Sequence, residues 1–161
     1  MRVVEVFGIR AQVPNNAPVV LLSEVGGSRL LPVWVGEVEA GAIAWAMEGQ
    51  ESARPLTHDL LLAALQVAGG RAIGQVEITA LVENVFHAAL VLDNDERVDC
   101  RASDAIALAL RAHVPIFVAD DVLDEASVVA DDADDEATDM PEVDVEKFRE
   151  FLDTITPEDF A

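Results

Sequence analysis

The chain has few of the residues that make a site easy to recognise. Its one cysteine, Cys100, excludes an internal disulfide, and the start shows no export signal, which together predict a cytoplasmic protein. No apolar run approaches the roughly 18 residues of a membrane span, so no membrane partner is expected. Aromatic residues make up 5% of the chain and tyrosine is absent, so base stacking finds little support.

Familiar catalytic motifs are absent as well. There is no P-loop, no GxGxxG after a strand, no nucleophile elbow and no Cys/His spacing for zinc. The pattern therefore argues against the enzyme and zinc-binding classes that these motifs define, and attention turns to ionisable side chains at the ends of predicted helices.

Basic residues are scarce, and the charge is unevenly distributed. The net charge is −21, but residues 1–119 hold 14 acidic and 8 basic side chains, whereas residues 120–161 hold 17 acidic and 2 basic. Most of the acidity therefore lies in the last quarter of the chain, unlike that of a salt-adapted protein. A negative body repels nucleic acid at long range unless basic residues cluster or cations intervene.

Apolar periodicity predicts a mixed-sheet α/β domain of the α+β type, with hairpins at the N-terminus and three packed helices. At least two connections are too short for helical crossovers, which argues against a doubly wound parallel sheet. The predicted strands cover residues 2–13, 18–22, 29–35, 72–82, 84–92, 97–101 and 116–118, and the helices begin near residues 37, 57 and 103.

Capping residues and apolar spacing give finer predictions for two of these helices. Thr57 is the expected N-cap of the second helix and Ser103 that of the third. The second helix is expected to bury Leu61, Ala64, Leu65 and Ala68, and the third Ile106, Ala109, Leu110 and His113.

Composition divides the chain into three parts. Residues 1–120 are expected to form the folded domain, residues 121–143 an acidic flexible linker, and residues 144–161 an amphipathic C-terminal helix. Such a short helix needs a partner surface, either on its own domain or on a second subunit. Its expected apolar face consists of Val145, Phe148, Phe151, Leu152 and Ile155.

The segment from Arg54 to Leu60 carries the most suggestive chemistry. His58 and Asp59 fit an acid–base or metal site, because imidazole titrates near neutrality and a carboxylate can orient it or bind a divalent ion. The structural alternative is that Asp59 complements the helix dipole and His58 covers an edge of the core. Neighbouring helix residues also point in different directions, so the pair need not act together.

A similar segment follows at Arg101 to Asp104. Arg54 and Arg101 each precede a helix, where a guanidinium can bind phosphate or pair with the nearby carboxylates. Glu39, Asp59 and Asp104, all in first helical turns, form a possible ligand set for Mg²⁺ or Mn²⁺ if they converge. Thr57 and Ser103 are candidate substrate-binding hydroxyls.

Three stretches together resemble the bifunctional nuclease domain family: residues 31–40, residues 54–61, and residues 101–109 with Pro115 and Ile116. The resemblance spans about residues 1–120, and the acidic tail lies outside it. It implies a compact mixed-sheet fold, self-association as a homodimer or higher homo-oligomer, and nuclease activity as DNase, RNase or both. The high alanine content, with nine arginines and one lysine, suits a GC-rich bacterial source. The polar residues at matching positions are Glu39, Arg54, Thr57, His58, Asp59, Arg101, Ser103 and Asp104.

Two hypotheses follow. In the first, the protein is a metal-assisted phosphodiester hydrolase acting on nucleic acid. His58 serves as general base or acid, Glu39, Asp59 and Asp104 hold the cation, and Arg54 and Arg101 stabilise the phosphate charge. In the second, it is a non-enzymatic regulatory or assembly module, whose polar residues form an ion-pair network and whose acidic tail binds a basic partner.

Overall fold

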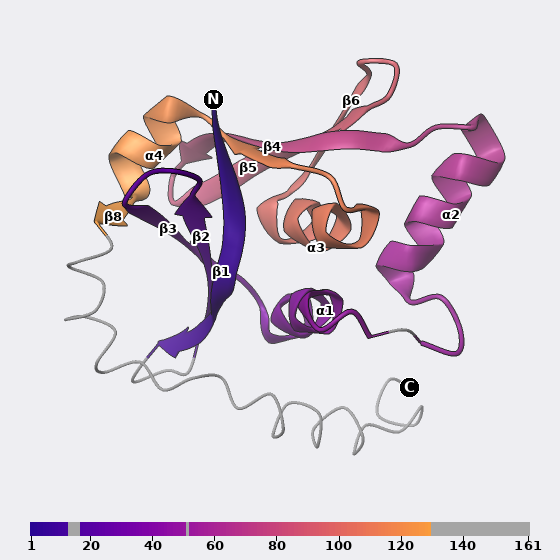
Figure 1. Cartoon of the computed structure of the whole chain (residues 1–161), viewed down its shortest axis with the longest axis horizontal. Helices are drawn as coiled ribbons and strands as arrows, with labels where there is room; N and C mark the ends of the chain where they lie inside the picture. Colours follow the sequence, from indigo (N-terminus) through magenta and orange to yellow (C-terminus); the bar gives the residue numbers. More distant parts are fainter. Residues whose placement is uncertain (13–16, 51, 130–161) are drawn as a thin grey trace.

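One twisted mixed sheet organises the molecule in the computed structural model, which describes residues 1–12, 17–50 and 52–129 (Figure 1). The strand order is β6-β5-β4-β7-β1-β2-β3-β8. The strands are β1 (Arg2–Gln12), β2 (Ala17–Glu24), β3 (Arg29–Trp34), β4 (Ile73–Val82), β5 (Val85–Leu92), β6 (Arg97–Arg101), β7 (Ile116–Val118) and β8 (Val128–Val129).

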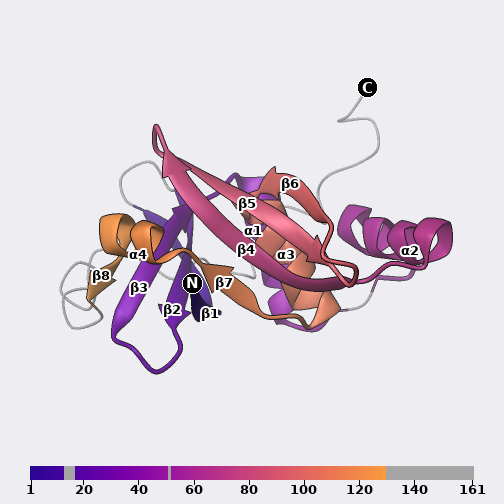
Figure 2. The same ribbon diagram turned by 90° about the horizontal axis from the view of Figure 1, so that it is seen from above.

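Two groups of hairpins meet at the short central strand β7. The β1–β2–β3 and β4–β5–β6 groups are antiparallel throughout, and β7 pairs antiparallel with β1 and parallel with β4. Figure 2 shows both groups from above. Between β4 and β5, Glu83 and Asn84 adopt positive φ and form a tight turn in place of a helical crossover. The predicted mixed sheet with hairpins is confirmed.

Among the residues that the structure describes, four helices accompany the sheet: α1 (Glu37–Met47), α2 (Thr57–Gly69), α3 (Ala102–Ala112) and α4 (Asp120–Ala126). α3 lies between α1 and the β4–β6 part of the sheet, with α2 beside it (Figure 1). α3 is rich in alanine and buried over most of its length, so the sheet and α1 can approach it closely. Within the described part of the chain, no helix is both long and apolar enough to cross a bilayer.

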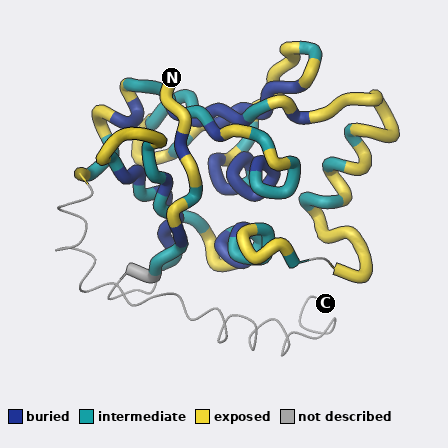
Figure 3. The backbone as a smooth tube through the Cα atoms, viewed as in Figure 1, coloured by how far each residue is buried: buried dark blue, intermediate teal, exposed yellow. Residues whose placement is uncertain are grey.

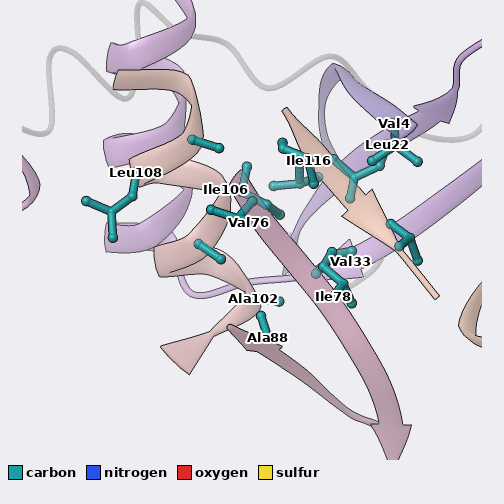
Figure 4. Packing of buried hydrophobic residues seen from close by; sticks show 14 of the residues in the cluster. Val4, Leu22, Val33, Val76, Ile78, Ala88, Ala102, Ile106, Leu108 and Ile116 are labelled. Carbon is teal, nitrogen blue, oxygen red and sulfur yellow. The ribbon is translucent and has the colours of Figure 1, made fainter. Parts of the chain in front are cut away.

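The core lies between the sheet and α3. Val76 and Ile78 of β4, Ile106 of α3 and Ile116 of β7 are buried in a single apolar cluster (Figure 4). Each fully buried aliphatic side chain of this kind stabilises the fold by about 1.5–3 kcal/mol relative to exposure. This packing fixes α3 firmly against the sheet, and with it the polar residues at the amino end of α3.

The folded part extends further than the sequence predicted. The sequence predicts that the domain ends at residue 120 and that an acidic linker follows, but residues 120–129 form α4 and β8. Val122 and Leu123 are buried, and Arg29 forms an ion pair with Asp124 at 2.8 Å. The acidity of this segment suggested a solvated linker, but acidic residues in a first helical turn are stabilised by the helix dipole and are compatible with a helix. The linker beyond residue 129 and the helix at 144–161 lie outside the described residues.

α2 does not bury the apolar stripe predicted for it. None of its residues is fully buried, and the partly buried Leu62 and Leu65 make its contact with the core. Leu61 is 40% exposed. The predicted stripe was right for Leu65 but wrong for Leu61, Ala64 and Ala68, which are exposed. α2 carries apolar residues on more than one face, so periodicity alone did not identify the inner one.

Helix boundaries also differ in detail. The N-cap positions of α2 and α3 are Leu56 and Arg101, not Thr57 and Ser103, which are the first and second residues inside their helices. His113 is not part of the buried face of α3: it ends the helix in a left-handed conformation and is exposed. Capping preference therefore located both helix starts to within one or two residues, which is the usual spread of a helix boundary.

Candidate active site at three helix amino ends

Polar side chains from three helices meet where α1, α2 and α3 begin. Glu39 lies in the first turn of α1 and His58 near the start of α2. Asp104 lies in the first turn of α3, and Arg101 is the N-cap residue of that helix. The N-cap residues of these helices supply no side-chain hydrogen bond to the helix. Their first N–H groups are therefore left to other acceptors, which favours anions at this place.

Arg101 is the centre of this cluster. Its Nε donates to Asp104 Oδ2 at 2.7 Å and its Nη2 to Asp104 Oδ1 at 3.1 Å, while Nη1 donates to Glu39 Oε1 at 2.9 Å. The side chain is 66% exposed. A guanidinium held on two sides by carboxylates has a fixed orientation, and its exposed edge is directed at solvent. Gly36 has no side chain, and this leaves room for the Glu39 carboxylate. A Cβ at position 36 would clash with that carboxylate unless Glu39 moved.

His58 joins the same cluster through Asp104. His58 Nε2 lies 3.3 Å from Asp104 Oδ1, and the two side chains are 15% and 28% exposed. A carboxylate beside one imidazole nitrogen orients the ring and leaves the other nitrogen for a second partner. The cluster of Glu39, His58, Arg101 and Asp104, called here the polar cluster, thus brings together four of the predicted site residues.

Asp59 belongs to a different set of contacts. Its Oδ1 accepts a hydrogen bond from Arg111 Nε at 3.0 Å, and its Oδ2 accepts one from the Leu56 backbone N–H at 3.0 Å. Asp59 therefore closes the amino end of α2 and ties that helix to α3, while its neighbour His58 faces the polar cluster. Both of its oxygens are engaged in these contacts, and neither contacts a residue of the polar cluster.

Arg111 was not singled out from the sequence. Its side chain is 8% exposed, and its Nη1 donates to the Ala107 carbonyl at 3.0 Å. Its Nη2 is buried without a hydrogen-bond partner. The sequence offered one signal for it: Arg111 lies seven residues after Asp104 and therefore on the same side of α3. That signal is weak, because basic residues are common in the last turn of a helix.

The remaining candidates lie around these contacts. Arg54 and Thr57 are exposed, and Arg54 forms no ion pair with any described residue. Ser103 is buried, at 9% exposure, so its hydroxyl lies beneath the surface. Arg54 thus remains an open basic group close in sequence to His58, and Ser103 is poorly placed to meet a substrate.

Charge pairing shifts the titration of the cluster. Hydrogen bonding to Arg101 holds the pKa of Asp104 below its usual value against the opposing effect of burial, and His58 lowers it further. The pKa of Arg101 is raised, first by its hydrogen bond to Asp104. Cys100, which precedes Arg101, behaves oppositely: burial raises its pKa to about 11, and Asp104 and Asp99 add to the shift. At neutral pH the cluster holds an ionised carboxylate, and Cys100 is a protonated thiol.

The pKa of Asp104 predicts a pH dependence of stability. A carboxyl whose pKa is lower in the folded state stabilises the fold above its unfolded pKa of about 3.9, and the gain is lost as the pH falls through the folded pKa. The difference in free energy of unfolding between wild type and Asp104→Asn should therefore shrink as the pH falls below about 4. Urea unfolding of both proteins over that range measures it, and a constant difference would contradict the pairing.

The polar cluster can be compared with what a divalent cation needs. No group of three or more His, Cys, Asp or Glu side chains close enough to hold a metal ion is found among the described residues. Of the three predicted ligands, Glu39 and Asp104 both contact Arg101, and Asp59 contacts Arg111. Within the described residues, the arrangement is a carboxylate-bound guanidinium and not a preformed metal centre.

The amino-acid sequence that forms this site matches a known protein family. Residues 20–131 match the model of the bifunctional nuclease domain. That range includes His58, Arg101 and Asp104 and ends just after β8. It also covers α4, which supports the extension of the folded domain beyond residue 120.

Individual relatives divide into two groups. A bacterial protein of Mycobacterium tuberculosis, Uncharacterized protein Rv1829, is 48% identical over 162 residues, which cover 98% of this chain and 96% of that protein. Bifunctional nuclease 2 of Arabidopsis thaliana is 33% identical over 114 residues, covering 65% of this chain and 34% of its own length. Bifunctional nuclease 1 of Oryza sativa subsp. japonica is 31% identical over 119 residues, covering 70% and 35%.

The similarity to the plant proteins is confined to about a third of their length, whereas the mycobacterial protein matches almost from end to end. The family model covers well over half of the present chain, and the resemblance inferred from three short stretches is thereby confirmed. This chain belongs to the bifunctional nuclease domain family.

Proposed function

We propose that the protein is a nuclease that hydrolyses phosphodiester bonds of DNA, RNA or both. Membership of the bifunctional nuclease domain family supports the proposal, as do the printed names of the plant relatives. The single observation that carries it is the meeting of His58, Asp104 and an exposed Arg101 at the amino ends of three helices. Proton transfer and anion binding are the two tasks that this reaction requires.

In the proposed reaction, Arg101 binds the non-bridging oxygens of the scissile phosphate with the exposed edge of its guanidinium. His58 accepts a proton from the attacking water, whose oxygen forms the new bond to phosphorus. The leaving oxygen departs with its bond to phosphorus broken and takes up a proton, which the imidazolium can return. Asp104 orients the imidazole, and Glu39 orients Arg101.

The divalent cation remains part of the proposal. Mg²⁺ or Mn²⁺ would supply further charge neutralisation at the phosphate. Glu39 and Asp104 would hold it, because they are the carboxylates of the polar cluster, whereas Asp59 contacts Arg111 and the Leu56 N–H outside that cluster. Neutralisation matters here because the chain carries a net charge of −21 and a polyanionic substrate must approach it.

The test is cleavage of labelled single-stranded DNA and RNA by the purified full chain, with Mg²⁺ or Mn²⁺ and with chelator. We expect cleavage that the chelator abolishes. Cleavage that persists in chelator would exclude a role for the cation but would still support the hydrolase activity. No cleavage of either substrate under any of these conditions would contradict the proposed activity.

One observation favours a second candidate, a non-enzymatic regulatory or assembly module. The carboxylates of Glu39, Asp59 and Asp104 are all neutralised by arginines within the fold, as in a structural ion-pair network. The acidic tail would then bind a basic partner. An inactive protein that captures a basic polypeptide, and loses it when residues 130–161 are removed, would support this alternative.

Self-association belongs to the same proposal. The exposed apolar side chains Phe7, Trp34 and Val38 offer area to a second copy, and the family resemblance implied a homodimer or higher homo-oligomer. Sedimentation equilibrium of the full chain measures the mass directly. A monomer at all concentrations would exclude it.

A further inference from the structure

α2 turns a continuous apolar face toward solvent. Leu60 and Val67 are 59% and 88% exposed, and Leu56 is 40% exposed at the preceding turn. Figures 1 and 3 show this helix at the side of the molecule, exposed along most of its length. Residues spaced by three or four positions share a helix face. The outer stripe, as we call it, consists of Leu56, Leu60, Ala63, Ala64 and Val67.

Basic groups stand at both ends of the outer stripe. Arg54 precedes α2 and forms no ion pair with any described residue. Arg71 follows α2 and reaches Asp93 only at 4.0 Å, with both side chains nearly half exposed. The one acidic residue between them, Asp59, is paired with Arg111 on the inner side. In a chain of net charge −21, this apolar face with basic ends is suited to an acidic apolar partner.

We propose that the outer stripe binds residues 144–155 of the same chain as an amphipathic helix. Val145, Phe148, Leu152 and Ile155 recur at helical spacing, so a helix over this segment would carry them on one apolar face. Residues 144–161 also hold six acidic and two basic side chains, which complement Arg54 and Arg71. A segment this short is marginal as a free helix and gains stability by covering an apolar surface.

The chain between the two parts is long enough for this contact. Residues 130–143 span up to about 3.3–3.6 Å each when extended, or roughly 46–50 Å in all. A domain of about 125 residues has a radius of gyration near 14 Å, so the segment can cross the molecule from β8 to α2, which Figure 1 shows at opposite ends. The mycobacterial relative matches 98% of this chain, so the similarity continues into this region.

A second copy of α2 is a poorer occupant. Antiparallel packing of two outer stripes would bring Arg54 of one copy toward Arg71 of the other, which is unfavourable. Parallel packing would bring identical arginines together. Pairing of two α2 helices in either direction would also give Phe148 and Phe151 no apolar partner. A segment of the same chain, in contrast, is tethered near α2 and is therefore present at high effective concentration. The outer stripe lies on the opposite side of α2 from His58, so the proposal is independent of the nuclease activity.

Amide hydrogen exchange on the full chain tests the contact. The double variant Phe148→Glu/Phe151→Glu should speed exchange in residues 57–69 by about tenfold or more, because it removes the cover of α2. The variant Leu60→Glu/Val67→Glu should in turn speed exchange in residues 145–155. Both α2 positions are exposed, so the fold does not depend on them. Both effects should be independent of protein concentration.

Val85→Glu is the matched control, because Val85 is 58% exposed at the start of β5 and lies outside both the proposed contact and the surface proposed for self-association. It should change neither region. Unchanged exchange of α2 in the Phe148→Glu/Phe151→Glu variant would overturn the proposal. Protection of α2 that rises with concentration, together with a doubled mass, would assign the outer stripe to a second copy instead and would overturn it equally.

Discussion

Replacing Asp104 with alanine is expected to lower the rate of phosphodiester cleavage by about 10²–10³-fold, within the range of general acid–base catalysis. Asp104 receives two hydrogen bonds from Arg101 and lies 3.3 Å from His58 Nε2, so its loss releases both groups at once. His58→Ala should cost a similar factor. Because the two residues act as a unit, the double variant should be little worse than either single one. Initial rates on the preferred substrate measure each factor.

Asp99→Ala is the matched control for this result. Asp99 lies on β6, two residues before Arg101, and is exposed. The substitution removes the same charge near the site without a contact to His58 or Arg101, and should leave the rate within about twofold, since exposed charges act weakly through solvent. If Asp104→Ala and His58→Ala both retain the wild-type rate, neither residue takes part in the reaction.

The second large effect concerns stability. Arg111→Met is expected to lower the free energy of unfolding by about 2 kcal/mol, because breaking one side of a largely buried ion pair leaves the other charge unpaired. Asp59 is 39% exposed, so water compensates for part of the loss and the value falls below that of a fully buried pair. Urea unfolding at neutral pH measures the change.

A surface pair provides the comparison. Arg71→Met removes an arginine whose nearest carboxylate, Asp93, is 4.0 Å away and exposed, and should change stability by less than about 0.5 kcal/mol. Adding Asp59→Asn to Arg111→Met should recover part of the loss, since the unpaired charge is then gone. If Arg111→Met proves as stable as wild type, apolar packing has replaced the ion pair at no cost, and Arg111 does not hold α2 in place.

Such a loss would bear on the site as well as on the fold. Arg111 and Asp59 connect α3 to the first turn of α2, one residue away from His58. α2 has no fully buried residue of its own, so this contact carries much of what fixes its amino end. A shift of α2 would move His58 relative to Asp104.

Much of the architecture followed from short-range patterns. Alternating and helical apolar periods located seven of the described strands and the first three helices within a few residues, and turn residues gave the hairpins. The sequence patterns did not predict α4, because its composition, with Asp120 and Asp121 at the start, resembles a solvated acidic segment. Its folding depends on Val122 and Leu123 reaching an apolar site formed by distant parts of the chain.

The sequence by itself determined the class of fold, the family resemblance and the set of polar residues at helix starts, because these depend on local spacing and residue type. Tertiary structure alone decided which of them meet. Consecutive helix residues point about 100° apart, so His58 joined Asp104 while Asp59 turned to Arg111. That division depends on how α2 and α3 pack, and packing is settled by contacts between residues far apart in the chain.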